Sequence, residues 1–563
     1  MQFDPVLVSD WLSRTAHRFP DKNALVSRDQ HLTYCQLDEK STNLASALIL
    51  LGFKKGDRAV ICLDNSPEAV ISIYGILKVG GVFTVIDPKS PWLVINSIIT
   101  DSAARLLITA RRKLYEGDGP QFSTADSQLI IVDGHKSSPR HYPQALIFEG
   151  LVEKLDASIT LPRLLENDLA CLIYTSGSTG RPKGIICTHH NMVTAARSII
   201  QYLENTRDDV ILDVMPLSFD YGLYQIIMCF MFGGTVVLES SFAYVQDILA
   251  AIEKEKVTGF PLIPSISAML LKLKKFPAVQ LKSLRYITST GAAWPVSHIR
   301  HFRQHLPQVK LYSMYGLSEC KRVSYLPPEL IDKHPDSVGI PMPNLEVAIV
   351  DGRGHPLPAG KPGQLIVRGP TVMQGYWRDE KLTRKVFRPG SYPEERWLQT
   401  GDIFRQDENG LLYYVGRRDR QIKSFGHRIN PSEIERVIAG LDGLMEVAAV
   451  SVPDEIGGEV IATFVVVKKG KKITEDQIRQ FCRQYLEPYK IPRRIWWLKS
   501  LPKTANGKID YKKLLDSLKS SETGQKAGQK EIAAINAGSL PVKEPKKLHF
   551  NTGGHCPGAS GKG

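Results

Sequence analysis

Residues 174–184 read YTSGSTGRPKG, a stretch with three glycines, four Ser or Thr hydroxyls, one proline and one lysine. An apolar run of strand length, LACLI (169–173), precedes it, and IIC (185–187) and a segment with helical spacing (188–200) follow. The pattern predicts a glycine-rich loop at a strand edge. Such a loop turns backbone N–H groups inward and lets a bulky anion approach without meeting Cβ atoms, so a polyphosphate is its expected guest.

This stretch differs from the common nucleotide-binding loop, in which a lysine follows the last glycine directly. Here Arg181 and Pro182 separate Gly180 from Lys183. Taken alone, the stretch is also compatible with a flexible surface turn, because Gly/Ser/Thr-rich loops are common.

Composition and cysteine usage describe an ordinary globular chain. It has 563 residues, of which 43% are hydrophobic and 23% charged, so several packed units are expected. No signal-peptide core opens the chain, and Lys78 and a glycine pair interrupt its longest apolar region (70–86), so neither secretion nor a membrane span is predicted. Eight cysteines without a C-x-x-C pair argue against zinc and against a disulfide framework, and a cytoplasmic location is the expectation.

The formal net charge of +14 raises the question of a nucleic-acid partner. Residues 521–563 contribute six lysines and three acids, and the remaining excess is spread over the chain. No basic stripe interleaved with aromatic residues stands out, so no nucleic-acid partner is expected, although a basic face would suit an acidic protein partner.

Strand-length runs such as LDVM (212–215) and RYITST (285–290) alternate with helical segments, which predicts a mixed α/β architecture. The texture changes near residue 416, where a compact region of strands and helices begins. The predicted organisation is a large N-terminal domain of several subdomains (1–416), a hinge (417–420), a small, mobile α+β C-terminal domain (421–518) and a disordered tail (519–563).

Ten segments in sequence order resemble the adenylate-forming superfamily of acyl-CoA synthetases, peptide-synthetase adenylation domains and luciferases, over about residues 10–516. They are LTYCQLDEKSTNLASAL (32–48), LKVGGVFTVIDPKSP (77–91), YTSGSTGRPKG (174–184), SFDYG (218–222), STGAAWP (289–295), MYGLSEC (314–320), LQTGD (398–402), GRRDRQIKSFGHRINPSEIE (416–435), LEPYKIP (486–492) and LPKTANGK (501–508). A single such match would be weak, whereas ten in order are specific.

The resemblance implies a two-step ligase that uses ATP and Mg²⁺. Such enzymes convert a carboxylic acid into an acyl-adenylate and pyrophosphate, and a thiol then attacks the mixed anhydride. Charge spreads over the α-phosphoryl oxygens in the first step, so fixed cations are what the site most needs. The expected thiol belongs to coenzyme A or to a phosphopantetheinyl carrier protein.

Roles for individual residues follow from the resemblance. Catalytic roles fall on Lys508, as the cation at the α-phosphate, on Lys183 and on Glu319, which is also the expected Mg²⁺ ligand. The predicted nucleotide-binding set is Thr175, Ser176, Gly177, Thr179, Gly180, Lys183, Gly291, Ala292, Ala293, Met314, Tyr315, Gly316, Asp402, Arg417 and Lys508. Within it, Tyr315 would stack on adenine and Asp402 and Arg417 would hold the ribose hydroxyls.

Two of these residues also have simple structural readings. Asp419 falls on the hinge about which the small domain rotates, but an exposed charged turn is about as probable from sequence alone. Lys508 follows an Asn-Gly turn pair, where a solvated loop lysine is the ordinary alternative.

The predicted substrate-binding residues lie in SFDYGLYQ (218–225). Asp220 falls where amino-acid-activating relatives pair with the α-ammonium, and Phe219 falls where fatty-acyl and aryl ligases usually carry a histidine. An amino acid is therefore favoured, with a locally paired Asp220 as the alternative. Tyr221 and Tyr224 are expected to crowd the pocket floor and to favour a small substrate.

Arg322, three residues beyond Glu319, falls on the strip that lines one pocket wall in relatives. It is either held by a protein carboxylate or turned to solvent, or it offers its planar fork to a polar group of the substrate. Three functional classes remain open: a ligase loading an amino acid onto a separate carrier protein, an acyl-CoA synthetase, and a binding protein that keeps the fold without catalysis.

Overall fold

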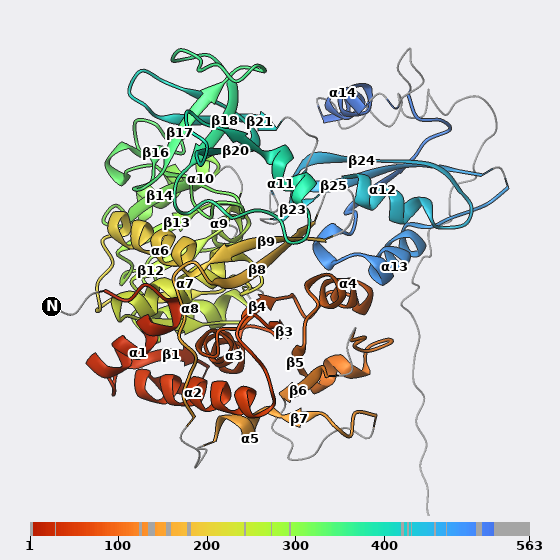
Figure 1. Cartoon of the computed structure of the whole chain (residues 1–563). Helices are drawn as coiled ribbons and strands as arrows, with labels where there is room; N and C mark the ends of the chain where they lie inside the picture. Colours follow the sequence, from red (N-terminus) through yellow and green to blue (C-terminus); the bar gives the residue numbers. More distant parts are fainter. Residues whose placement is uncertain are drawn as a thin grey trace, which may run out of the picture.

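The structure is a computed structural model of the chain (Figure 1). It describes residues 4–28, 30–122, 126–132, 141–153, 159–176, 182–240, 242, 244–271, 273–291, 294–417, 422–424, 427–429, 431–454, 458–468, 470–502, 509 and 511–522. Within these residues no helix is long and apolar enough to cross a membrane, and the seven cysteines are free.

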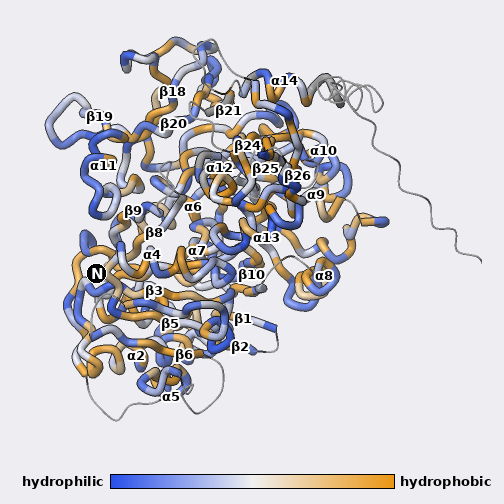
Figure 2. The backbone as a smooth tube through the Cα atoms, turned by 90° about the vertical axis from the view of Figure 1, so that its right-hand side faces the viewer, coloured by the Kyte–Doolittle hydropathy of each residue, from blue (hydrophilic) through white to orange (hydrophobic). Residues whose placement is uncertain are grey.

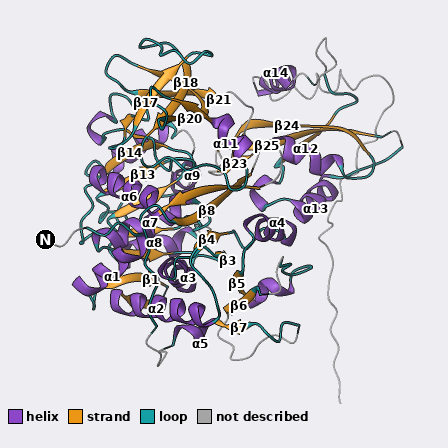
Figure 3. Ribbon diagram, in the orientation of Figure 1, coloured by secondary structure: helices purple, strands orange, loops and turns teal. Residues whose placement is uncertain are grey.

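Two large sheets form the body of the N-terminal part. The first has the order β7(Leu146–Ile147), β6(Gln128–Val132), β5(Leu106–Ala110), β3(Arg58–Cys62), β4(Val82–Val85), β8(Leu169–Ser176) and β9(Pro182–Thr188). The second has the order β16(Ile340–Pro341), β15(Ser324–Tyr325), β14(Lys310–Tyr315), β13(Tyr286–Ser289), β12(Gly259–Leu262), β10(Val210–Asp213), β11(Thr235–Leu238), β1(Asn23–Ser27) and β2(Gln30–Thr33). Their inner strands are parallel, so helices cover their faces (Figure 3).

The helices of this part have the local sequence signals of their type. They are α1(Val8–Arg18), α2(Tyr34–Leu50), α3(Pro67–Lys78), α4(Trp92–Ser102), α5(Phe148–Val152), α6(His189–Leu203), α7(Asp220–Phe232), α8(Val245–Lys254), α9(Pro264–Leu271) and α10(Val296–His305), with short 3₁₀ turns at Arg111–Tyr115 and Pro328–Leu330. Thr33 and Thr188 form capping boxes at the starts of α2 and α6. Nearly every residue of α7 is buried, and this helix packs against α1, α6, β10 and β11 at the centre of the main core.

A third, smaller sheet completes the N-terminal part. It joins β17(Glu346–Val350), β18(Gly363–Arg368), β20(Arg396–Gln406) and β19(Phe387–Pro389), with β21(Leu412–Arg417) pairing β20 and α11(Glu380–Val386) beside β19. Figure 2 shows hydrophobic residues running through the inner strands, while hydrophilic residues gather in outer loops such as those near β19 and α11.

The small C-terminal domain is built on its own sheet. The order is β23(His427–Ile429), β22(Ile422–Ser424), β25(Gly458–Val467) and β24(Leu444–Asp454), with β26(Arg494–Trp497) parallel to β25. Residues of β24 alternate between two cores: Val447 and Ala449 pack with α12(Pro431–Ala439) and α13(Glu475–Tyr485), whereas Ala448 and Val450 face the side of α14(Tyr511–Glu522). A 3₁₀ turn at Pro488–Lys490 follows α13.

The predicted mixed α/β class, with a large N-terminal and a small C-terminal domain, is confirmed. β21 ends at Arg417 and the next strand begins at Ile422, on either side of the predicted hinge, whose Asp419 lies outside the described residues. The helix α14 continues to Glu522, four residues into the segment predicted as a tail, and the remainder of that tail lies outside the described residues.

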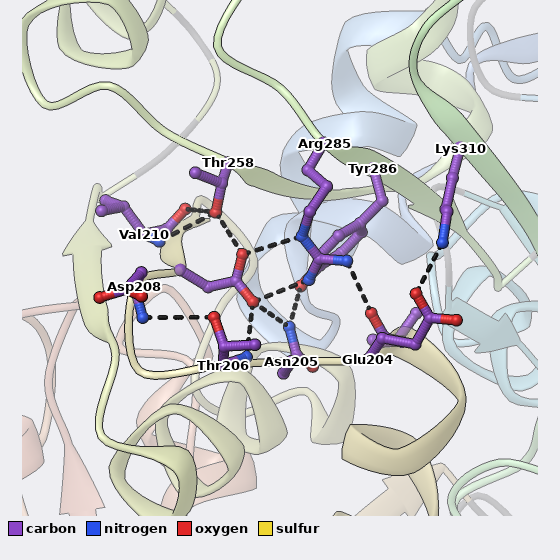
Figure 4. Close-up of polar contacts among 11 residues, drawn as sticks. Glu204, Asn205, Thr206, Asp208, Val210, Thr258, Arg285, Tyr286 and Lys310 are labelled. Atoms are coloured by element: carbon purple, nitrogen blue, oxygen red, sulfur yellow. Dashed lines mark hydrogen bonds and ion pairs between the residues drawn. The ribbon is translucent and has the colours of Figure 1, made fainter.

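A polar knot around Asp209 joins the ends of several elements of the second sheet (Figure 4). Asp209 is 3% exposed and lies just before β10. It accepts hydrogen bonds from Arg285 at 2.7 and 3.1 Å and from Thr258 at 2.8 Å. Burial alone would raise the pKa of Asp209, but hydrogen bonds from Arg285, the Thr206 backbone, Thr258 and Asn205 hold it below its ordinary value.

Candidate active site

A cavity of about 960 Å³ lies between the two domains and receives side chains from both. From the N-terminal part its lining includes Thr175, Lys183, Ser218, Phe219, Asp220, Gly291, Trp294, Met314, Tyr315, Gly316, Glu319, Lys321, Arg322 and Tyr376; from the small domain it includes Lys423, His427, Glu433, Glu487, Tyr489 and Lys490. Most described residues of the predicted nucleotide and substrate sets therefore share one space.

The opening stretch forms the tip of a hairpin between β8 and β9. Thr175 pairs with Lys183 and Ser176 with Pro182 across the two strands. Lys183 therefore lies in a strand and not in the predicted loop, which is tolerated because Pro182 is the first residue of β9. The buried Thr175 hydroxyl oxygen has no hydrogen-bond partner in the described part of the chain, which suits a phosphate oxygen as guest. Gly177, Thr179 and Gly180 lie outside the described residues.

Lys183, Glu319 and Tyr376 form a connected group in the cavity. The Lys183 ammonium donates to the Tyr376 hydroxyl at 2.9 Å and lies 3.4 Å from the Glu319 carboxylate. Tyr376 in turn donates to Glu319 at 2.9 Å. Sequence reasoning missed Tyr376, which belongs to none of the ten segments and reaches the site through a backbone bridge to Ile185 in β9.

Tyr315 and Asp402 meet beside this group. Tyr315 ends β14, and its hydroxyl donates to the Asp402 carboxylate at 2.5 Å. The pairing of β20 with β21 sets Asp402 opposite Arg417, whose side chain lies outside the described part. Asp402 is fully buried and lies behind the cavity lining, whereas Tyr315 reaches the lining itself.

The small residues predicted around adenine are needed for close packing. Gly291 has φ +86°, which favours glycine, and a Cβ on Gly316 would lie 2.1 Å from the Lys321 carbonyl oxygen. Both glycines line the cavity together with Met314. Ala292 and Ala293 lie outside the described residues.

At the substrate end, Phe219 and Asp220 line the cavity where α7 begins. Asp220 is 5% exposed. Tyr221 and Tyr224 are buried behind this wall and do not reach the lining, so their contact with substrate stays a prediction. The Tyr221 hydroxyl is 2.6 Å from that of Thr288.

Two cations follow Glu319 on the opposite wall. Lys321, with φ +66°, is 2% exposed and its ammonium donates to the Ser318 carbonyl at 2.8 Å and to the Cys187 sulfur at 3.0 Å. Burial alone would lower the pKa of Lys321, but the thiols of Cys187 and Cys171 and the Asp220 carboxylate raise it above its ordinary value. Sequence reasoning singled out Arg322 and missed Lys321.

The small domain presents β23 to the cavity. The His427 ring stacks on Tyr489 with centroids 3.6 Å apart and lies 6.0 Å from Phe219. Burial, with Lys490 nearby, lowers the pKa of His427 to about 4, so this ring is neutral at physiological pH. Lys490 itself is held by Glu433 and Glu487, each at 2.8 Å. Lys508 lies outside the described residues.

The donor groups of the cavity fit a magnesium ion only in part. Among the described residues no group of three or more His, Cys, Asp or Glu side chains lies together as a metal site. Glu319 lines the cavity beside Lys183, and a single hard oxygen ligand suits Mg²⁺ that is held mainly by nucleotide phosphates.

Comparison with known families and proteins identifies the class. Residues 12–377 match the AMP-binding enzyme family and residues 433–508 match the AMP-binding enzyme C-terminal domain. A long-chain-fatty-acid–CoA ligase of Bacillus subtilis is 30% identical over 90% of this chain and 93% of its own length. A linear gramicidin synthase of Brevibacillus parabrevis is 29% identical over 88% of this chain, which spans 6% of that synthase.

A solved structure shares the same fold over nearly the whole chain. The o-succinylbenzoate CoA synthetase of Bacillus subtilis superposes with a TM-score of 0.77 at 26% identity, covering 90% of this chain and 98% of that one. The fold and cavity are those of an AMP-forming acid–thiol ligase that uses ATP. The chain belongs to the AMP-binding enzyme family, within the adenylate-forming superfamily.

Proposed function

We propose that this ligase activates a small amino acid as its acyl-adenylate and transfers the acyl group to the phosphopantetheine thiol of a separate carrier protein. The observation that carries the proposal is Asp220, a carboxylate only 5% exposed that lines the cavity at the start of α7. A buried carboxylate at the substrate end can pair with an α-ammonium group, which a plain fatty acid lacks.

In the first half-reaction, a substrate carboxylate oxygen attacks the α-phosphorus of ATP and pyrophosphate leaves. Lys183 and the hairpin at Thr175 lie at one end of the cavity, where they can hold the β- and γ-phosphates. Lys508 would supply a second cation at the α-phosphate. Mg²⁺, bound by the phosphates and Glu319, would neutralise part of the charge that develops on the phosphate oxygens.

In the second half-reaction, the carrier thiol attacks the acyl carbon and AMP leaves. His427 and Lys423 of the small domain line the same cavity as Phe219 and Asp220. This arrangement, with β23 turned toward the substrate end, is the one expected for thiol transfer. A separate arrangement would bring Lys508 to the nucleotide for the first half-reaction.

A second candidate is an acyl-CoA synthetase, and two observations favour it. Lys321 lies close enough to Asp220 for the carboxylate to raise the lysine's pKa, so a protein cation already acts on that acid. The B. subtilis relative that matches over nearly its full length is named a CoA ligase. In this reading the acid carries no amine and the acceptor is coenzyme A.

ATP–pyrophosphate exchange across amino acids and amine-free acids tests the choice of acid. We expect exchange with at least one small amino acid above its amine-free counterpart. Thioester formation is then compared between coenzyme A and a panel of phosphopantetheinylated carrier proteins. Exchange confined to amine-free acids, with coenzyme A as acceptor, would replace the first proposal by the second.

A further inference from the structure

Arg322 stands at the substrate end of the cavity, between β14 and β15. The two strands pair antiparallel, with Tyr315 opposite Ser324, and this hairpin fixes the intervening segment that carries Glu319, Lys321 and Arg322. Arg322 is 4% exposed and belongs to the cavity lining, as does Asp220. The arginine is therefore not turned to solvent, which was one of the alternatives open from sequence.

The guanidinium of Arg322 is largely unpartnered within the described part of the chain. There its only hydrogen bond runs from one Nη to the backbone oxygen of Lys321 at 3.3 Å, and its Nε has no partner. No acidic side chain among the described residues forms an ion pair with it. A guanidinium has five N–H donors, and a buried charge is ordinarily paired, so most of the hydrogen-bonding capacity here is unused.

A comparison within the protein shows how a structural arginine is held. Arg285, which is more exposed than Arg322, makes a two-point contact with the Asp209 carboxylate at 2.7 and 3.1 Å. Arg322 instead lies over the Tyr221 ring, its central carbon 4.4 Å from the ring centroid. Stacking on an aromatic face holds the guanidinium plane in position while its edge donors remain available.

The acids near Arg322 are engaged elsewhere. Asp220 acts on the ammonium of Lys321, and Glu319 contacts Lys183 and Tyr376. A long alkyl chain in this end of the cavity would bury the Arg322 charge against hydrocarbon, which is strongly unfavourable. A second anionic group on the substrate would instead pair with the planar fork through two parallel hydrogen bonds.

We infer that Arg322 is the anchor of an anion subsite, and that the acid activated here is a short dicarboxylic acid whose second carboxylate binds this guanidinium. The inference rests on the proposed function, because it names the far end of the acid that the ligase adenylates. An acidic amino acid and an amine-free diacid share this chemistry, and Asp220 would discriminate between them.

Matched pairs of acids test the subsite in ATP–pyrophosphate exchange. Aspartate and glutamate are compared with asparagine and glutamine, and succinate and glutarate with butyrate and valerate. We expect the wild-type protein to favour one diacid over its neutral partner in kcat/KM. Arg322→Met, which keeps an apolar stem and removes the charge, should abolish that preference with a loss of about 10²-fold for the diacid while exchange with the neutral acid persists.

Two further variants separate recognition from folding. Arg322→Lys keeps the charge without the fork and should retain part of the diacid preference. Arg285→Met, whose site lies outside the cavity lining, should lower the thermal midpoint without changing the preference between diacid and neutral acid.

The remaining outcomes overturn specific claims. Exchange with neutral acids and no preference for any diacid would refute the subsite and leave the ligase proposal standing. Equal loss with every acid in Arg322→Met would make Arg322 a structural part of the wall. Exchange with none of the acids would refute the proposed function itself and the subsite with it. If Arg322→Met does not fold, the wild-type preference and Arg322→Lys decide.

Discussion

The hydroxyl of Tyr376 bridges the two charged groups that lie at the nucleotide end of the cavity, Lys183 and Glu319. Its removal would leave both with one partner fewer. We expect Tyr376→Phe to lower kcat/KM for ATP–pyrophosphate exchange by about tenfold or more, because a hydrogen bond to a charged group contributes about 1.5–3 kcal/mol.

Tyr286→Phe is the matched control for this prediction. The Tyr286 hydroxyl also lies in a polar contact, 3.1 Å from Asn205, but Tyr286 does not line the cavity (Figure 4). This variant should leave exchange kinetics unchanged. Equal loss in both variants would mean that the Tyr376 effect comes from general destabilisation.

Asp220 provides the residue-level test of the amino-acid proposal. Asp220→Asn removes the charge and keeps the shape, so an amino acid would bind with its ammonium group buried and unpaired. We expect KM for the amino acid to rise by about 10²-fold, corresponding to about 3 kcal/mol, while KM for ATP changes little.

Amine-free acids are the comparison for Asp220→Asn, because they carry no ammonium to lose its partner. Their kinetics should change less than those of the amino acid. If the amine-free acids lose as much, Asp220 acts through Lys321 on the shape of the wall and does not recognise an amine.

At the scale of elements, the Asp209 knot ties the start of β10 to Thr258 before β12 and Arg285 before β13. Asp209→Asn should lower the free energy of unfolding by about 2–3 kcal/mol at pH 7, because Arg285 keeps its charge and loses its partner. This is below the value for a fully buried pair, since the Arg285 side chain is 32% exposed. Urea unfolding of both proteins measures the difference.

The pH dependence of that difference has a definite sign. The folded-state pKa of Asp209 lies below its ordinary value, so its contribution is present above the unfolded-state pKa of about 3.9 and is lost as pH falls through the folded-state pKa. The gap between wild type and Asp209→Asn should therefore be constant from pH 7 to about 5 and shrink below about pH 4. A gap that widens on acidification would contradict the assignment.

At the scale of the whole molecule, the small domain contributes to the cavity through His427 and Lys423 in this arrangement. If Lys508 serves only the other arrangement, Lys508→Ala should reduce adenylation by about 10²- to 10³-fold and spare thioester formation from pre-made acyl-adenylate. His427→Ala should do the reverse, with a loss of up to about tenfold in thioester formation from the lost ring contacts.

Measuring the two half-reactions separately decides between one arrangement and two. Pyrophosphate exchange reports the first, and single-turnover transfer from synthetic acyl-adenylate to the thiol reports the second. Loss of both half-reactions in either variant would indicate that one arrangement serves both steps.

Much of the architecture was predictable because local patterns carry it. The apolar runs at 169–173 and 285–290 became parts of β8 and β13, and the change of texture at residue 416 falls where the sheets of the two domains separate. Strand length, alternation and capping are properties of neighbouring residues, so one sequence suffices to see them.

The sequence by itself determined the family, the fold class and the nucleotide hairpin, since ten motifs in order encode them. Only the tertiary structure decided how the side chains of the site are partnered. Tyr376 reaches Lys183 across 193 positions of sequence, and Tyr221 supports Arg322 from another element altogether. Whether a buried arginine is paired or left with unused donors depends on which acids the packed chain brings within about 4 Å, and no local pattern contains that distance.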